Sequence, residues 1–164
     1  MELIVRHRDE GRATWTLNGL DITKASAAET GGAHGLMEQL VTAAANPPMH
    51  IHTDEEEAFY VLDGELELEV DGAVARATPG TYALVPRGAA HTFRVLTDTA
   101  RVLVLASAPG GAPGGGVAAF FEAMGEPAPA PVLPAPTAPD PEVVVATGGR
   151  YGITFLPPPG VDAP

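Results

Sequence analysis

Short segments in which apolar and polar residues alternate recur along the first two thirds of the chain. The segment 65–70, ELELEV, is the clearest, because every second residue is leucine or valine and the others are glutamates. A period of two places successive side chains on opposite faces of a β-strand. The pattern therefore predicts a strand with one buried face and one hydrated face.

Turn-forming dipeptides separate similar segments from one another. Asn18-Gly19 and Asp63-Gly64 are both typical of tight hairpins. We predict strands at residues 14–17, 20–25, 33–43, 59–62, 66–70, 74–77, 81–85, 92–96 and 101–106. Many short strands with such turns between them indicate an all-β antiparallel sandwich or barrel. This domain is expected to span residues 1–108.

The composition changes beyond residue 108, and we predict a second segment, 109–164, that packs on the barrel or on a partner subunit. It begins with a linker rich in glycine and proline. A short helix is predicted over Val117–Met124, and Gly125 would end it. An extended strap rich in proline and alanine follows.

The end of the chain contains a second predicted helix. Asp140 is a suitable N-cap, and Pro141 suits the first helical turn. The dipeptide Gly148-Gly149 is expected to stop this helix after about two turns. The apolar segment Tyr151–Leu156 then predicts a last strand-like element.

Composition narrows the class of protein. The 164 residues suffice for one domain with a tail, and a hydrophobic fraction of 45% can form a core. The formal net charge of −12 argues against nucleic acid and membrane surfaces as partners. We find no signal-peptide pattern and no apolar run long enough to span a membrane, and we therefore expect a cytoplasmic location. Because the chain has no cysteine, a metal site must use nitrogen and oxygen ligands.

Two of the five histidines, His50 and His52, are separated by a single residue. On a strand they would point to the same side, a few ångströms apart, as two ligands of one metal ion require. A run of three glutamates, 55–57, follows the pair. Strand parity favours Glu57 as a further ligand, with the other two as alternatives. His91 stands at the start of another predicted strand and would complete the set.

Three imidazoles and one carboxylate suit one divalent transition metal, which could be Fe, Ni, Co, Mn, Cu or Zn. Four protein ligands leave one or two positions for water or substrate. The remaining candidates, His7 and His34, are expected to be exposed or structural. Arg87 and Arg94 flank His91, and we interpret them as a turn residue and an outward-facing strand charge.

The residues around these ligands resemble the two sequence motifs of the cupin family. The segment HIHTDEEEAFYVLDG, from His50 to Gly64, is similar to the first motif in its spacing. The segment GTYALVPRGAAH, residues 80–91, is similar to the second, and 15 residues separate the two motifs. Val95 stands where the second motif usually has asparagine, which is not a metal ligand. The resemblance implies a cupin jelly-roll β-barrel that holds a metal ion through His50, His52, Glu57 and His91.

The layout of the chain also resembles small bacterial cupins of the quercetinase-like (quercetin 2,3-dioxygenase-like) group. The likeness rests on PRGAAHTFRV, DTARVLVL, the linker, a short Phe-rich helix and a closing RYGI. It implies a metal-dependent dioxygenase, an oxidoreductase, acting on an aromatic or enolisable small molecule, with Glu57 as both ligand and base. Phe59, Phe93, Val95 and Leu103 are candidates to line the substrate pocket, or equally to form plain barrel core.

Other features leave alternatives open. Phe120, Phe121 and Met124 could form a lid over the barrel mouth, or pack outside it or on a partner subunit. Barrels of this family usually pair through N-terminal strands, so the resemblance implies a homodimer. Two further functions stay open: a metal-dependent isomerase, lyase or hydrolase of a small polar metabolite, and a non-catalytic cupin that binds a small molecule.

Overall fold

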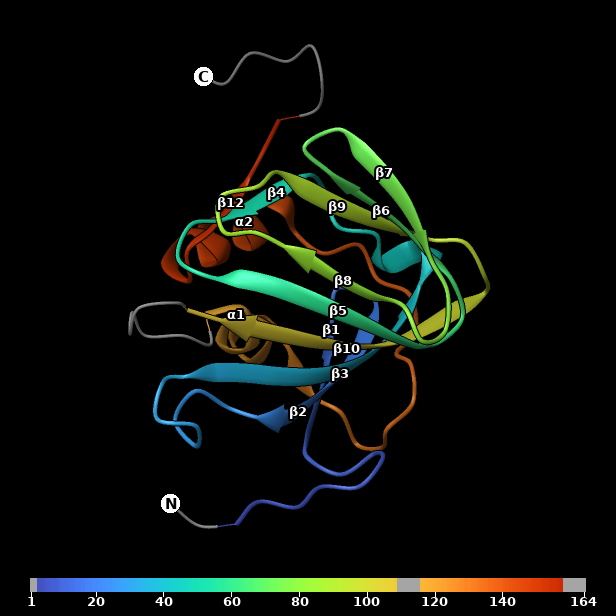
Figure 1. Cartoon of the computed structure of the whole chain (residues 1–164). Coiled ribbons are helices and arrows are strands. Elements are labelled where there is room, and N and C mark those ends of the chain that lie inside the picture. Colours follow the sequence, from blue (N-terminus) through green and yellow to red (C-terminus); the bar gives the residue numbers. More distant parts are fainter. Residues whose placement is uncertain (1–2, 109–115, 158–164) are drawn as a thin grey trace.

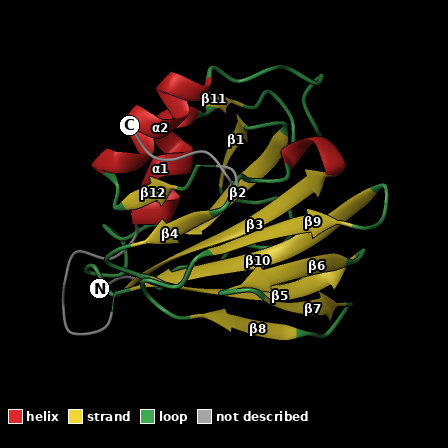
Figure 2. Cartoon of the chain, turned by 90° about the horizontal axis from the view of Figure 1, so that it is seen from above, coloured by secondary structure: helices red, strands yellow, loops and turns green. Residues whose placement is uncertain are grey.

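The computed structural model describes residues 3–108 and 116–157. Most of the glycine- and proline-rich segment where we predicted a linker lies outside these residues. The described chain folds into two antiparallel β-sheets that pack face to face as a jelly-roll barrel (Figure 1). Its two α-helices lie together at one end of the barrel, and a short 3-10 helix (Ala43–Ala45) lies apart from them (Figure 2). The predicted all-β fold class is confirmed.

In the part of the chain that the structure describes, the larger sheet has seven strands in the order β11-β1-β2-β3-β10-β5-β8. Their bounds are β11 (Glu126–Pro127), β1 (Arg12–Thr16), β2 (Gly19–Ala25), β3 (His34–Thr42), β10 (Thr99–Ser107), β5 (Glu56–Asp63) and β8 (Tyr82–Val85). The smaller sheet, within the same described residues, has five strands in the order β12-β4-β9-β6-β7. Their bounds are β12 (Ile153–Phe155), β4 (His50–His52), β9 (His91–Val95), β6 (Leu66–Val70) and β7 (Ala73–Ala77).

Two hairpin turns show how local sequence sets the strand connections. The first turn consists of Leu17 and Asn18, one residue earlier than the predicted Asn18-Gly19, because Gly19 is already paired in the sheet. Both turn residues have positive φ (50° and 67°), as a two-residue hairpin turn of this kind requires. After β5, Gly64 has a φ of 73°, and a Cβ there would lie 2.3 Å from the carbonyl oxygen of Thr99. Glycine is therefore needed at this turn.

The core lies between the two sheets and follows the alternation of the strands. In β6, Leu66 and Leu68 are buried, as the pattern ELELEV predicted. In β10, Val102 and Val104 are buried in the same core, whereas Leu105 is 36% exposed on the opposite face. The inner face of β10 is therefore built by the valines.

Two short helices and β12 close one end of the barrel. The first helix, α1 (Gly116–Met124), follows the predicted bounds within one residue. Its Phe120 is 2% exposed and packs in a second apolar cluster with Val144 and Ile153. No helix among the described residues is long and apolar enough to cross a membrane.

The second helix corrects one expectation. This helix, α2, extends over Pro141–Arg150, and the glycines at positions 148 and 149 do not stop it. Asp140 caps it as predicted, because its carboxylate accepts a hydrogen bond from the backbone N–H of Glu142 at 2.9 Å. Gly148 instead permits close packing, since a Cβ at this position would lie 2.7 Å from the ring of Phe155. The glycine thus lets α2 lie against β12.

Candidate metal centre

Strand β4 presents two histidines to the barrel interior. His50 and His52 are both buried, and their ring centroids are 5.0 Å apart. His91 begins β9 and pairs with His50 across the two strands, with ring centroids 4.1 Å apart. Strand parity and the pairing of β4 with β9 therefore bring the three imidazoles together.

Glu57 supplies a carboxylate from the other sheet. It is the second residue of β5 and is 5% exposed. Its Oε2 lies 3.1 Å from Nε2 of His91 and 3.6 Å from Nε2 of His52. Ligand atoms of these residues and of His50 all lie within 4.8 Å of one another. The four side chains form one buried cluster that could hold a metal ion.

The two neighbouring glutamates have other partners. Glu55 is buried and its carboxylate accepts hydrogen bonds from the backbone N–H groups of Gly116 and Val117, at 3.0 and 2.9 Å. It thereby caps the N-terminus of α1. Glu56 accepts a hydrogen bond from the hydroxyl of Ser107 at 3.1 Å. Of the run 55–57, the structure brings Glu57 to the histidines.

Backbone carbonyl groups orient two of the imidazoles. Nδ1 of His50 lies 2.9 Å from the carbonyl oxygen of Pro48, and Nδ1 of His91 lies 3.0 Å from that of Ala89. A ring that donates from Nδ1 keeps the lone pair of Nε2 for a metal ion. Nε2 of His52 is buried and has no hydrogen-bond partner among the residues that the structure describes. A bound cation would satisfy this atom, so the residues present fit a metal ion.

The electrostatics of His50 and His52 suit the same role, whereas burial acts to lower the pKa of His91 but its hydrogen bond to Glu57 outweighs burial and raises this pKa. Burial and the neighbouring His91 lower the pKa of His50 to about 4. Burial also lowers the pKa of His52, although Glu57 opposes this effect. Both imidazoles are therefore neutral at pH 7, as metal ligands must be. Burial acts to raise the pKa of Glu57, but His52 and His91 outweigh it and lower this pKa to about 2.

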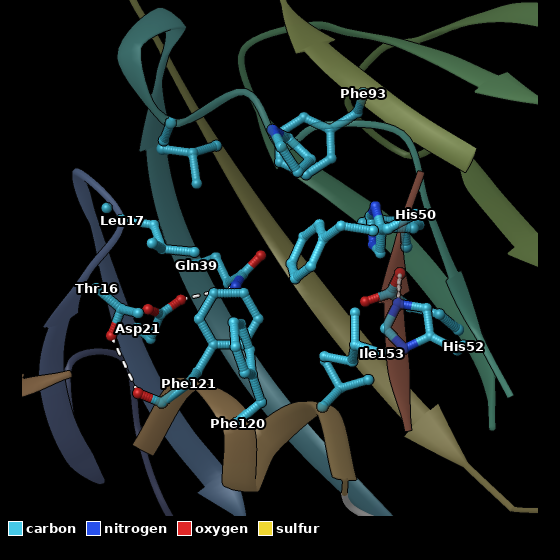
Figure 3. Close-up of a pocket in the computed structure, with 18 residues that line it drawn as sticks. Thr16, Leu17, Asp21, Gln39, His50, His52, Phe93, Phe120, Phe121 and Ile153 are labelled. Atoms are coloured by element: carbon cyan, nitrogen blue, oxygen red, sulfur yellow. Dashed lines mark hydrogen bonds and ion pairs between the residues drawn. The ribbon is translucent and has the colours of Figure 1, made fainter. Parts of the chain in front are cut away.

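A cavity of about 60 Å³ adjoins the cluster (Figure 3). The candidate ligands His50, His52 and Glu57 lie on one side of it. Its apolar walls come from both sheets and from α1, and include Val41, Phe59, Phe93, Phe120, Phe121 and Ile153. The aromatic side chains of α1 thus cover the cavity, in the position that a lid would occupy.

Two of the four predicted pocket residues do not line this cavity. Phe59 and Phe93 are on its wall, with ring centroids 6.0 Å apart. Val95 is buried in the core instead. Leu103 lies on the outer face of the larger sheet, because Val102 and its inward-facing counterparts take the inner positions of β10. The expectation for Leu103 is therefore corrected.

The remaining histidine and arginine candidates lie away from the cluster. His7 is exposed, and His34 is half-buried at the start of β3. Arg87 is exposed in a turn, and Arg94 points outward to Glu67, with an N–O distance of 2.6 Å. These positions match their interpretation as surface or structural residues.

The sequence reasoning missed three polar residues of the cavity, which are Thr16, Asp21 and Gln39. Asp21 of β2 and Gln39 of β3 line it together with the candidate metal ligands. Both stand in strand segments next to apolar residues, LDI and EQL. A charged side chain in such a strand is a weak signal of a functional position, because the local pattern does not show which face is buried.

These features define a class of protein: a jelly-roll barrel with a candidate N₃O metal centre at the inner face of its sheets. Residues 37–107 match the family model described as "Cupin domain". This segment of the chain is a cupin domain, and both predicted motifs lie within it.

One curated relative is the quercetin 2,3-dioxygenase of Bacillus subtilis (strain 168). It is 39% identical over 56 residues, which are 34% of this chain. The match covers 17% of that relative's length. The similarity supports the quercetinase-like group, over a segment that is a small part of the relative.

Solved structures show the same fold. Ectoine synthase from P. lautus has a TM-score of 0.56 and 21% identity, covering 85% of this chain and 99% of that one. A predicted oxalate decarboxylase from Thermotoga maritima has a TM-score of 0.57 and 16% identity, covering 63% and 98%. The polyketide cyclase RemF from Streptomyces resistomycificus has a TM-score of 0.55 and 25% identity, covering 65% and 80%. The fold is thus shared by proteins with different names and activities.

Proposed function

We propose that the chain holds one divalent transition metal and acts as a dioxygenase on an aromatic or enolisable small molecule. The observation that carries the proposal is the buried cluster of His50, His52, Glu57 and His91, which opens on an apolar cavity. The similarity to quercetin 2,3-dioxygenase supports this choice of reaction. A bound metal would supply a Lewis-acidic centre for a substrate oxygen and for oxygen chemistry.

The residues of the chain would divide the remaining tasks. His50, His52 and His91 would hold the metal through Nε2, while their surroundings keep the rings in place. Glu57 would be a ligand and also accept the proton of the substrate's enol or hydroxyl group. Burial acts to raise the pKa of Glu57, but the histidines outweigh it and lower this pKa to about 2, so the carboxylate is ionised and can accept a proton. Phe59 and its apolar neighbours would exclude water from the reacting groups.

The size of the cavity favours a small substrate. Its volume of about 60 Å³ is well below the ~300–1,000 Å³ that is typical of pockets for drug-sized ligands. Leu17, Pro47 and Phe155 are shared with an outer groove of about 600 Å³ between the first hairpin and α2. A substrate as large as a flavonol would have to displace these side chains and extend into the groove.

The same observation supports a second candidate, a metal-dependent isomerase or lyase of a small polar metabolite. A small cavity with the polar pair Asp21 and Gln39 on its wall suits such a substrate. A non-catalytic cupin that binds the same class of molecule would use the same contacts without turnover.

Metal content tests the first part of the proposal. Protein purified without chelators is expected to contain about one equivalent of a transition metal by mass spectrometry. His91→Ala removes a ligand and should reduce this content at least tenfold. His34→Ala, a histidine outside the cluster, is the matched control and should retain the metal. Equal metal content in the two variants would overturn the proposed site.

Oxygen consumption tests the reaction. The metal-loaded protein is incubated with a flavonol or with a small enolisable 1,3-diketone in an oxygen electrode. We expect consumption with the diketone, with at least a hundredfold loss in Glu57→Gln that retains metal. Turnover of a polar metabolite by the zinc form without oxygen would favour the isomerase or lyase instead. Binding with full affinity in Glu57→Gln and no turnover in the parent would indicate a binding protein.

A further inference from the structure

The cavity has a second polar side, across from the candidate metal ligands. Asp21 and Gln39 are cross-strand neighbours on β2 and β3, and both are buried. Nε2 of Gln39 donates a hydrogen bond to Oδ1 of Asp21 at 2.7 Å. Figure 3 shows this pair on one side of the cavity and His50 and His52 on the other. The aromatic rings described above stand between the two polar sides.

One oxygen of Asp21 has no hydrogen-bond donor. Oδ2 is buried and lacks a partner among the described residues. Thr16 is close enough to lower the pKa of Asp21, but its single hydroxyl proton is donated to the carbonyl oxygen of Phe121 at 3.1 Å. A buried acceptor without a donor destabilises the folded state. The fold itself therefore gains nothing from this oxygen.

No lysine or arginine is among the described residues that line the cavity. Burial raises the pKa of Asp21 to about 7, although Gln39 and Thr16 oppose the effect. A buried carboxyl group with a raised pKa at the wall of a cavity is typical of a functional position. The missing donor is thus expected from a molecule in the cavity.

We propose that Asp21, supported by Gln39, is a specificity-determining site that binds a hydroxyl group of the ligand at the end opposite the metal. This inference rests on the proposed function, since the other end of the ligand is held at the candidate metal centre. The ligand would therefore be a small molecule with an anionic oxygen at one end, an apolar body and a hydroxyl group at the other.

A hydroxyl group fits this site better than an ammonium group does. A hydroxyl group can donate one proton to the unmet Oδ2 of the ionised Asp21 carboxylate, and can accept one when this carboxyl group is protonated. An ammonium group has three protons and would leave others without an acceptor against the apolar wall formed by Phe121 and its neighbours. The proposal therefore commits to a neutral hydroxyl.

Binding of matched ligand pairs to the cobalt(II)-loaded protein tests the proposal. Each pair has the same carboxylate, and a terminal hydroxyl in one member replaces a methyl group in the other. The pairs are 3-hydroxypropanoate with butanoate, 4-hydroxybutanoate with pentanoate, and 4-hydroxybenzoate with 4-methylbenzoate. The visible absorption of cobalt(II) reports occupation of the metal centre, and its titration gives Kd. 4-Aminobutanoate is the ammonium probe.

For the pair of matching length we expect the hydroxyl member to bind at least tenfold more tightly than the methyl member. Asp21→Leu should abolish or reverse this preference while the methyl member binds as before. Thr14→Val is the matched control, because Thr14 Oγ1 is another buried atom without a partner but is not on the cavity wall. This variant should keep the preference.

The outcomes separate the two proposals. If both members of every pair bind equally well to the parent protein, Asp21 is not a specificity site, while the metal centre stands. If 4-aminobutanoate binds more tightly than 4-hydroxybutanoate, the assignment to a hydroxyl is wrong. If cobalt binds but no probe changes its spectrum, both the inference and the proposed access of small ligands to the metal fail. Circular dichroism of Asp21→Leu checks that this substitution leaves the fold intact.

Discussion

At the scale of single residues, Asp21 links stability to pH. Its pKa is raised from 3.8 to about 7 in the folded chain, chiefly by burial. The folded state therefore holds this proton more tightly than the unfolded state does, and it loses stability as pH rises from 3.8 through 7. This loss of stability is absent below the unfolded pKa of 3.8 and complete above the folded pKa of about 7.

Asp21→Asn should remove this dependence. The difference in unfolding free energy between the variant and the parent is expected to be small at pH 4 and to grow in favour of the variant up to pH 8, at about 1.4 kcal/mol per pKa unit. His50, His52 and Glu57 also line the cavity, but they titrate in both proteins and largely cancel in the difference. Urea denaturation of the two metal-free proteins at several pH values measures this difference in unfolding free energy. A difference that does not change with pH would contradict the raised pKa.

The residue scale also shows what sequence can and cannot predict. His50 and His52 could be placed side by side because strand parity is a local property. The face of the strand on which Leu103 lies could not be predicted, since the segment RVLVLA is apolar at nearly every position and shows no alternation. Asp21 and Gln39 were missed because their meeting at a cavity depends on the pairing of β2 with β3 and on where α1 packs.

At the scale of elements, the two glycines near the end of α2 make a matched pair. A Cβ at Gly148 would lie 2.7 Å from the ring of Phe155, whereas a Cβ at Gly149 meets no described atom within 4 Å. Gly148→Ala should therefore destabilise the protein by about 1–3 kcal/mol through overpacking. Gly149→Ala should be neutral or stabilise it by up to ~1 kcal/mol through helix propensity. Thermal denaturation of the two variants measures the contrast, and equal effects would contradict the close packing of α2 on β12.

Glu55 couples α1 to the loop between β4 and β5. Its carboxylate accepts hydrogen bonds from two N-terminal amides of the helix that covers the cavity. Glu55→Ala removes these acceptors and should lower stability by about 0.5–2 kcal/mol. Hydrogen exchange in α1 should become faster. Glu56→Ala, one residue away and bonded to Ser107, is the control. Unchanged exchange in α1 of the Glu55 variant would show that this cap does not hold the helix.

The two helices also show the limits of prediction at this scale. The bounds of α1 followed from apolar spacing and from Gly125, which are local signals. The end of α2 did not, because the low helix propensity of Gly148 is overridden by its packing against Phe155. Propensity describes an isolated helix, whereas contacts with distant elements decide where a packed helix ends.

At the scale of the whole molecule, motif spacing and turn residues were enough to predict the barrel. The order of strands was not predicted, because sheet neighbours such as β3 and β10 are far apart in the sequence. The position of the C-terminal segment was also left open. It adds β11 to the edge of β1 and β12 to the edge of β4. The candidate centre is therefore enclosed by a part of the chain outside the motifs.

The same arrangement bears on the proposed homodimer. β11 occupies the edge of β1, so this N-terminal strand has no free edge at Thr14 and Trp15 for pairing with a second copy. The outer face of β5, β8 and β10 instead presents a group of exposed apolar side chains: Tyr60, Tyr82, Leu84 and Leu105. Their strands are adjacent in the sheet, so these side chains form one patch. We propose that a second copy of the chain covers this patch, because a twofold dimer packs the same surface of both copies together and the core of such an interface is apolar.

Light scattering after size-exclusion chromatography tests this interface. The parent protein should elute with twice the chain mass of 16.8 kDa. Tyr82→Glu places a charge in the patch and should yield the monomer, because burying an unpaired charge opposes association. Val74→Glu is the matched control, since Val74 is 61% exposed, as Tyr82 is 62% exposed, but lies on β7 of the other sheet. A monomeric parent would refute the dimer. Dissociation by Val74→Glu and not by Tyr82→Glu would move the interface to the smaller sheet.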